Sequence, residues 1–279
     1  GSSVQIDTTN GNTAPAGALI TLSNVDATSN TAGAESLTLI AGSSGNISLG
    51  IIGSATALGL LSIPSASTVN ATGNVTIRGG ATAGGTINIT QSVALLGATT
   101  FATTGGGVTA GNAITFTGTI NGSSPLSINA GTSGIATFGN IGSTTAVTGF
   151  SVTADTISQA GYVTSSGTVT YTAPTAITLS GNIVTQAVSA MINISGAGIT
   201  LNSPVRFDTT GGSAAGANIA LTNLNPSSSS YAISIIAGTA GTATFGTVGP
   251  TTAPASFLVT AGTISQTALA NVSGAVSYS

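Results

Sequence analysis

The chain has 279 residues, which is enough for one long domain or two ordinary ones. Only 3% of the residues are charged, compared with roughly 25% in an average soluble domain, and the formal net charge is −3. The sequence contains no His, Cys or Trp, and its only cationic side chains are Arg78 and Arg206. This composition argues against a nucleic-acid partner, disulfides, imidazole or thiolate metal sites, and Ser–His or Cys–His catalysis.

Short stretches in which large apolar residues alternate with Thr, Ser or Asn recur along the whole chain. A period of two predicts β-strands with one buried face, and clusters of Gly, Asn and Ser separate these stretches every ~8–12 residues. The 3.6-residue period of a helix is not found, so the sequence predicts an all-β fold with essentially no helix. The best candidate for a membrane helix is broken by Gly and Ser and is too short to span a bilayer. In chain order, the clearest predicted strands are Ser36–Ala41, Asn74–Gly79, Thr86–Thr90, Thr168–Ala173 and Asn218–Leu224.

A longer repeat is superimposed on this strand rhythm. The segment Gly134–Gln159 returns as Gly241–Gln266, with a constant shift and without a gap, and a more diverged copy occupies Gly45–Ile63. Self-similarity over such a long period is typical of proteins built by stacking copies of one structural unit.

A second repeated motif marks where the units begin. It reads VQIDTTNG at Val4–Gly11, TFATTGG at Thr100–Gly106 and RFDTTGG at Arg206–Gly212. Together the two motifs divide the chain into three repeats, 1–95, 96–201 and 202–279, the last of them incomplete. Because no Pro-rich or charge-rich linker separates the repeats, we expect one continuous domain over residues 1–279.

Three packings suit short strands with Gly-rich turns: a parallel β-solenoid, a row of β-sandwich domains and a barrel. A unit of ~95 to 107 residues would also fit one immunoglobulin-like sandwich, so tandem β-sandwich domains stay open as the alternative. Aromatic residues make up only 4% of the chain, fewer than sandwich cores of this size usually contain, and this favours the solenoid. With roughly 20–25 residues per coil and ~4.8 Å between strands, the chain would form about a dozen coils.

Aromatic residues supply the predicted core. Arg206 and Asp208 flank Phe207, so we expect Phe207 to point inward and the two charged side chains to pair on the outer face. Tyr171 and Tyr278 are equivalent positions of the repeat, which favours a structural role for them over a sugar-binding one. Six phenylalanines are expected to form the inward-facing structural ladder: Phe101, Phe138, Phe150, Phe207, Phe245 and Phe257.

The carboxylates do not suggest a catalytic pair. Asp7 and Asp208 are equivalent positions two repeats apart, so a solenoid would separate them by more than the ~5–10 Å between the carboxylates of a glycosidase. Asp26 and Glu35 lie in a stretch rich in Asn and Thr, where a solvated turn is a better interpretation than a calcium site. We therefore predict no catalytic, cofactor-binding or metal-binding residue and no enzymatic activity.

The string AITFTGTINGSSPLSINAGTSGIATFGNIGSTT, residues Ala113–Thr145, resembles the repeats of filamentous-haemagglutinin-like adhesins and of the giant β-strand-repeat surface proteins of bacteria. The resemblance extends over nearly the whole chain, because all three repeats share this pattern. It implies a right-handed parallel β-helix that is exported and displayed as a stalk, matrix fibre or adhesin shaft.

These observations predict a structural repeat segment of an extracellular fibre or adhesin shaft at the cell surface. No capping element is recognisable at either end of the pattern, so we expect contacts with neighbouring repeats of a longer chain or end-to-end self-association into filaments. The alternative is a module that binds a host or cell-surface glycan or a receptor. Neither a nucleic acid nor insertion into a membrane is expected.

Overall fold

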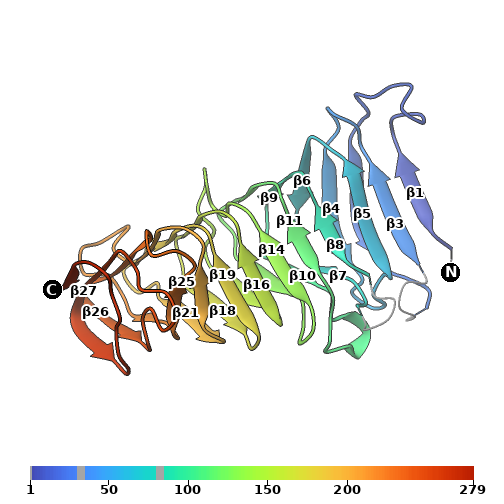
Figure 1. Ribbon diagram of the computed structural model, residues 1–279. Coiled ribbons are helices and arrows are strands. Elements are labelled where there is room, and N and C mark those ends of the chain that lie inside the picture. The colour runs from blue at the N-terminus through green and yellow to red at the C-terminus, as the bar shows by residue number, and fades with distance from the viewer. Residues whose placement is uncertain (1, 30–34, 80–84) are drawn as a thin grey trace. The chain divides into compact units, whose positions relative to one another are not determined.

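The computed structural model describes residues 2–29, 35–79 and 85–279. The protein is essentially all-β, with 1% helix, and its parallel strands stack into a β-solenoid of about ten turns (Figure 1). This confirms the predicted solenoid, since the sheets of a β-sandwich are antiparallel. A short 3-10 turn, Gly105–Gly107, lies between two strands.

The chain divides into two compact units. Unit 1 comprises residues 1–139 and 152–155, and unit 2 comprises residues 140–151 and 156–279. The division falls inside the second sequence repeat, at neither of the predicted repeat boundaries. The continuity of one domain over residues 1–279 stays a prediction.

Unit 1 contains two series of parallel strands. The first sheet stacks β1 (Val4–Asp7), β3 (Ser36–Ile40), β5 (Leu60–Ser65), β8 (Ile87–Ile89), β11 (Ile114–Phe116) and β14 (Ile135–Phe138). The second series contains β2 (Ile20–Val25), β4 (Ile47–Ile52), β6 (Thr68–Ala71), β7 (Val75–Thr76), β9 (Ser92–Leu95), β10 (Thr99–Ala102), β12 (Ile120–Asn121) and β13 (Leu126–Asn129). Each strand pairs in parallel with the strand one coil later, which is the defining pattern of a solenoid.

Unit 2 repeats this arrangement. One sheet stacks β16 (Thr156–Gln159), β19 (Ala176–Leu179), β22 (Ile199–Leu201) and β25 (Leu224–Pro226). The other strands are β17 (Val163–Ser165), β18 (Val169–Ala173), β20 (Ile183–Thr185), β21 (Ile192–Gly196), β23 (Val205–Asp208), β24 (Ile219–Ala220), β26 (Ala232–Phe245), β27 (Ser256–Gln266) and β28 (Val276–Tyr278). β15 (Phe150–Thr153) lies at the division between the two units.

The register of the strands shows that the coils differ in length. Ile157 pairs with Ile177 one short coil later, whereas a longer coil separates Ile87 from its partner Ile114. The coil that joins Val4 to its partner Leu37 is longer still, because it carries a long loop. Loops of this kind lengthen the coils and explain why the chain forms about ten turns rather than a dozen.

Alternation of side chains builds the core. In β8, Ile87 and Ile89 are buried while Asn88 between them is exposed, as a period of two requires. Leu61, Ile87 and Ile114 occupy equivalent positions of successive coils and stack on one another. Each such buried side chain stabilises the fold by about 1.5–3 kcal/mol relative to an exposed one.

Sequence repeats and coils do not have the same period. β1 of the first repeat lies in the first sheet of unit 1, whereas its equivalent β10 in the second repeat lies in the second series. A repeat is therefore not a whole number of coils. Equivalent residues of these two repeats consequently occupy different faces of the solenoid.

None of the helical structure in the described ranges is long and apolar enough to cross a membrane.

Candidate functional site

A threonine hydroxyl closes one long loop in each sequence repeat. The hydroxyl donates to a backbone carbonyl eight to ten residues later and accepts from the amide of that same residue. We call this arrangement the threonine clamp. In the third repeat its two distances are 2.8 and 2.9 Å, and Thr209 is fully buried. The three clamps join Thr8 to Ala18, Thr103 to Asn112 and Thr209 to Ala217.

An aspartate begins two of the three clamped loops. The Oδ1 atom of Asp7 accepts from the amide of Thr9 at 2.7 Å and from its hydroxyl at 2.6 Å. Asp208 makes the same two bonds to Thr210, at 2.7 and 2.6 Å. The hydroxyl and amide of Thr9 lower the pKa of Asp7, because they donate to its charged form. Both aspartate side chains thus stabilise a turn by accepting hydrogen bonds from the residue two positions later.

The predicted pairing of Arg206 with Asp208 is confirmed, but only Arg206 lies on the outer face as expected. Phe207 is buried as expected, and Arg206 forms an ion pair with Asp208. Asp208, however, is only 2% exposed, because the loop that follows β23 folds over it and Thr210 donates to its carboxylate. The alternation within the strand could not predict that Asp208 is buried, because the residues that bury it belong to the loop that follows.

Glycines with left-handed backbone let each clamped loop touch the next coil. Gly216 has φ 62°, and a Cβ atom built on it would lie 2.0 Å from the carbonyl oxygen of Ala237. Gly17 and Gly111 have φ 64° and approach the equivalent carbonyls, those of Ala41 and Ala130, at 1.9 Å. Only glycine fits these three positions, which explains why each loop motif ends with one.

A buried tyrosine–glutamine pair lies inside unit 2. The hydroxyl of Tyr171 donates to Oε1 of Gln159 at 2.8 Å, and Nε2 of Gln159 donates to the carbonyls of Gly161 and Gly181 at 2.8 and 3.0 Å. Burial raises the pKa of Tyr171 well above its usual value. The pair therefore stays neutral and links coils through the core.

The long sequence repeat duplicates this pair. Tyr278 donates to Oε1 of Gln266 at 2.6 Å. The edge-to-face contact of Phe150 with Tyr171 returns as that of Phe257 with Tyr278, with ring centroids 5.7 and 6.0 Å apart. Tyr278 is 45% exposed, whereas Tyr171 is fully buried. The predicted structural role of these tyrosines agrees with this placement.

All six phenylalanines of the predicted ladder are buried. They stack mostly on aliphatic side chains of neighbouring coils, as Phe207 does between Ile183 and Ile235. Phe116, which the sequence analysis did not include, stacks directly on Phe138 and meets Phe101 edge to face. The six do not share one strand series, because equivalent positions of the repeats fall on different faces.

Asn side chains connect successive coils along the outer surface. Oδ1 of Asn74 accepts from the amide of Thr100, and Oδ1 of Asn218 accepts from the amide of Thr242, at 2.8 and 2.9 Å. Further Asn side chains make the same contact, among them Asn140, Asn182, Asn223 and Asn225. The spacing between partners is 22 to 26 residues, which is one coil.

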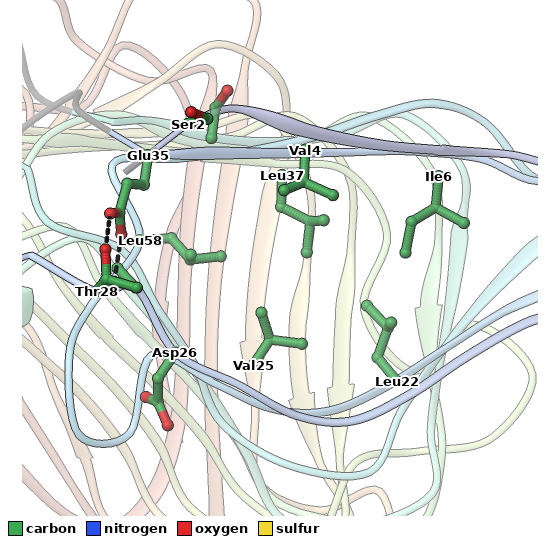
Figure 2. Close-up of a pocket in the computed structure, with 12 residues that line it drawn as sticks. Ser2, Val4, Ile6, Leu22, Val25, Asp26, Thr28, Glu35, Leu37 and Leu58 are labelled. Atoms are coloured by element: carbon green, nitrogen blue, oxygen red, sulfur yellow. Dashed lines mark hydrogen bonds between the residues drawn. The ribbon is translucent and has the colours of Figure 1, made fainter.

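One open cavity lies at the edge of unit 1, beside β1 and β2. Its volume is about 260 Å³. Figure 2 shows Val4 and Leu37 on one wall and Leu22 and Val25 on the opposite wall, with Leu58 between them. The lining combines buried side chains, Leu37 and Leu58, with Val4, which is 54% exposed.

Asp26 and Glu35 lie at the rim of this cavity. Glu35 accepts from the hydroxyl and amide of Thr28, which lower its pKa to about 2, the hydroxyl having the larger effect (Figure 2). Asp26 accepts from the amides of Ala55 and Thr56 at 2.8 and 3.2 Å, and these bonds lower its pKa. Each carboxylate holds a loop of the solenoid.

Within residues 2–29, 35–79 and 85–279, no three Asp or Glu side chains gather in a way that could hold a metal ion. The equivalent aspartates Asp7 and Asp208 belong to different units. In comparisons with known proteins, no family model, no curated protein and no solved structure matches this chain.

Proposed function

We propose that this chain is a structural segment of an extracellular fibre or adhesin shaft. The observation that carries the proposal is the use of its polar side chains. Three threonine clamps, two aspartate turns and a series of Asn side chains all bind backbone atoms of the same or the next coil. The sequence repeats copy these contacts. Each added repeat therefore brings its own hydrogen bonds to the coils beside it.

The composition supports an exported, load-bearing role. A surface of Thr, Ser and Asn with 3% charged residues leaves stability little affected by salt, because few charges are present to screen. The strands are joined by ladders of backbone hydrogen bonds that must break one coil at a time. The resemblance of residues 113–145 to adhesin repeats points in the same direction.

The proposal includes the absence of catalytic activity. The chain has no His, Cys or Lys to act as base, nucleophile or metal ligand. Asp7, Asp26 and Glu35 accept two or more hydrogen bonds each from nearby backbone and hydroxyl groups, and these bonds keep their pKa values low. Such carboxylates are poor proton donors and poor bases near neutral pH.

Single-molecule stretching tests the load-bearing role. The chain is held between two handles and extended while the force is recorded. A shaft of stacked coils should lengthen in discrete steps of about 80 Å, since a coil of about 23 residues extends by ~3.3–3.6 Å per residue. Smooth extension without steps would contradict the proposal.

A second candidate is the binding of a neutral glycan beside the clamped loops of unit 1. Two open hollows, of about 440 and about 330 Å³, flank the first and second loops. They are lined by equivalent residues, which is the observation that favours a shared ligand. The equivalent pairs are Thr9 and Thr104, Asn12 and Gly107, Pro15 and Thr109, Gly42 and Gly131, Ser43 and Thr132, and Ser65 and Thr153.

Several hydroxyls line each hollow among the apolar surfaces of small side chains, and Asp7 adds a carboxylate to the first hollow. Hydroxyls and apolar surface together are what a sugar contacts, so a neutral sugar is the ligand class proposed. The test is calorimetric titration with a panel of neutral oligosaccharides. Ser43→Trp and Thr132→Trp, which fill one hollow each, should each remove one binding site. If no oligosaccharide binds the unmodified chain, this second candidate is rejected.

A further inference from the structure

The two hollows of unit 1 belong to loop modules that are built from the same contacts. In each module, a hydroxyl in the turn of the next coil donates to a carbonyl of the clamped loop, at 3.3 Å. These bonds join Ser43 to Pro15 in the first module and Thr132 to Thr109 in the second. The second module has coils on both sides, because β10 pairs with β7 and with β13. The opening of its hollow is therefore a property of the loop module.

Unit 1 has three faces, and each face is a column of paired parallel strands. Face 1 is the sheet that runs from β1 to β14. Face 2 contains β2, β4, β6, β9 and β12, which pair in that order. Face 3 contains β7, β10 and β13, and Val75 of β7 also pairs with Ile52 at the end of β4. The chain passes the three faces in turn, as in the succession of β8, β9 and β10.

The two hollows lie at different corners between these faces. Asp7, Ile40 and Ser65, which end β1, β3 and β5, line the first hollow, so it lies where the chain leaves face 1. Thr104, just after β10, and Asn129, which ends β13, line the second hollow, so it lies where the chain leaves face 3. Different corners of a three-faced solenoid point away from its axis in different directions. The two hollows therefore open in different directions.

The length of a sequence repeat causes this rotation. From β1 to its equivalent β10 the chain makes three coils, which bring it to β8, and then passes two more faces. The tyrosines of unit 2 shift in the same way. Tyr171 lies in β18, whereas its equivalent Tyr278 lies in β28, which belongs to the column of β17, β20 and β23. Because β17 directly precedes β18 in a coil of three faces, this shift is again two faces beyond whole coils.

We propose that this chain bridges two neutral glycan molecules, with one molecule in each hollow of unit 1. The inference rests on the second candidate function and deepens it, because it states how the two sites are used together. Two sites bind one polymer more tightly than a single site only when the polymer can span both of them. A glycan would have to bend around the solenoid to reach from one corner to the other. Separate molecules need no such bend, so the rotated sites favour cross-linking over tighter binding of one molecule.

Neutral polysaccharides test the bridging. The probes are dextran, galactomannan and mixed-linkage β-glucan, each mixed separately with the chain while light scattering is recorded. The third loop has the same construction as the other two, with the hydroxyl of Thr239 donating to the carbonyl of Ala214 at 3.5 Å. Every test chain therefore carries Thr239→Trp, so that bridging through the third loop is prevented. Thr239 is exposed, so the fold should be preserved, and circular dichroism checks that it is.

Three variants of this test chain separate bridging from binding. Ser43→Trp fills the first hollow and Thr132→Trp fills the second, so each of these variants keeps one site. Ser44→Trp is the matched control, because Ser44 is exposed beside Ser43 but does not line the hollow. Calorimetric titration measures the binding of each chain independently of the scattering.

The test chain and the Ser44→Trp control should bind a polysaccharide and raise its scattering to a maximum, which falls again when excess chain occupies the polymer one site at a time. Ser43→Trp and Thr132→Trp should bind the same polysaccharide without this rise. The inference is overturned if the test chain binds without raising the scattering, or if either one-site variant still raises it.

These outcomes are separate from failure of the function on which the inference rests. Binding without cross-linking would reject the bridging and leave the glycan sites in place. If none of the three polysaccharides binds, the second candidate function and the bridging are rejected together. The stretching test of the shaft is independent of all these results.

Discussion

Replacing Thr209 by Val removes the clamp of the third loop and nearly preserves the shape of the side chain. The hydroxyl of Thr209 donates to the carbonyl of Ala217 and accepts from its amide, at 2.8 and 2.9 Å, and all of these groups are buried. Without the hydroxyl, the N–H and the C=O of Ala217 lose their partner where water does not reach. Each unsatisfied buried group costs about 1–3 kcal/mol, so the free energy of unfolding should fall by about 2–6 kcal/mol.

Two matched variants separate the cost of losing the buried hydrogen bonds from the effects of side-chain size and of exposure to solvent. Thr209→Ser keeps the hydroxyl and removes one methyl group, so it should cost only about 1 kcal/mol. Thr8→Val removes the clamp of the first loop, whose bonds are exposed to solvent, and water can replace the lost partner. That variant should cost less than about 1 kcal/mol.

Urea denaturation followed by circular dichroism gives the three unfolding free energies, with an unchanged m value showing that the same surface unfolds. Hydrogen exchange at the Ala217 amide should accelerate in Thr209→Val and stay slow in Thr209→Ser. If Thr209→Val loses no more stability than Thr209→Ser, the clamp does not hold the loop and the reasoning is refuted.

Three further predictions concern the core, the rim and the loops. Tyr171→Phe should cost about 1–3 kcal/mol in urea denaturation, because it leaves a buried glutamine oxygen without its donor, whereas the equivalent Tyr278→Phe should cost less than about 0.5 kcal/mol because water can reach that site. The pKa of Glu35 is lowered from its usual 4.5 to about 2, so its contribution to stability is complete above pH 4.5 and is lost as the pH falls towards 2. Thermal melts between pH 5 and pH 2 should therefore fall more steeply for the unmodified chain than for Glu35→Gln, and parallel curves would contradict this assignment. Gly216→Ala should prevent the loop from closing, because its Cβ would lie 2.0 Å from a backbone oxygen, while Gly107→Ala, at φ 79° with open space around it, should cost only about 1–2 kcal/mol.

The solenoid was predictable because its signal is local and repeated. Alternation of the type seen in Ile87, Asn88 and Ile89 fixes which side chain points inward, and four of the five predicted stretches each contain a strand. The fifth prediction, Asn218–Leu224, was wrong as one strand, because the chain turns within it and forms β24 and β25, which belong to different sheets. The constant shift between the second and third repeats also identified Tyr171 and Tyr278 as equivalent. The coil number was overestimated because loops such as the one between β1 and β2 lengthen a coil without adding a strand.

The clamps and the buried aspartate were not predictable from the same pattern. Thr209 and Asp208 sit in a motif that the repeat analysis recognised, but their partners lie in the loop that folds back over the strand. Such a contact depends on the path of the loop in space. The repetition of Thr-Thr in all three copies of this motif was the available signal, and it now has a physical reason.

Small-angle scattering of an extended chain tests the central claim most directly. One more copy of residues 96–201 is inserted after residue 201, where the next repeat begins. If each repeat forms coils that continue the solenoid, four to five coils are added at ~4.8 Å each. The cross-section should then stay the same, and the maximum dimension should grow by about 20–24 Å. A wider cross-section, or an inserted segment that scatters as an unfolded chain, would contradict the account.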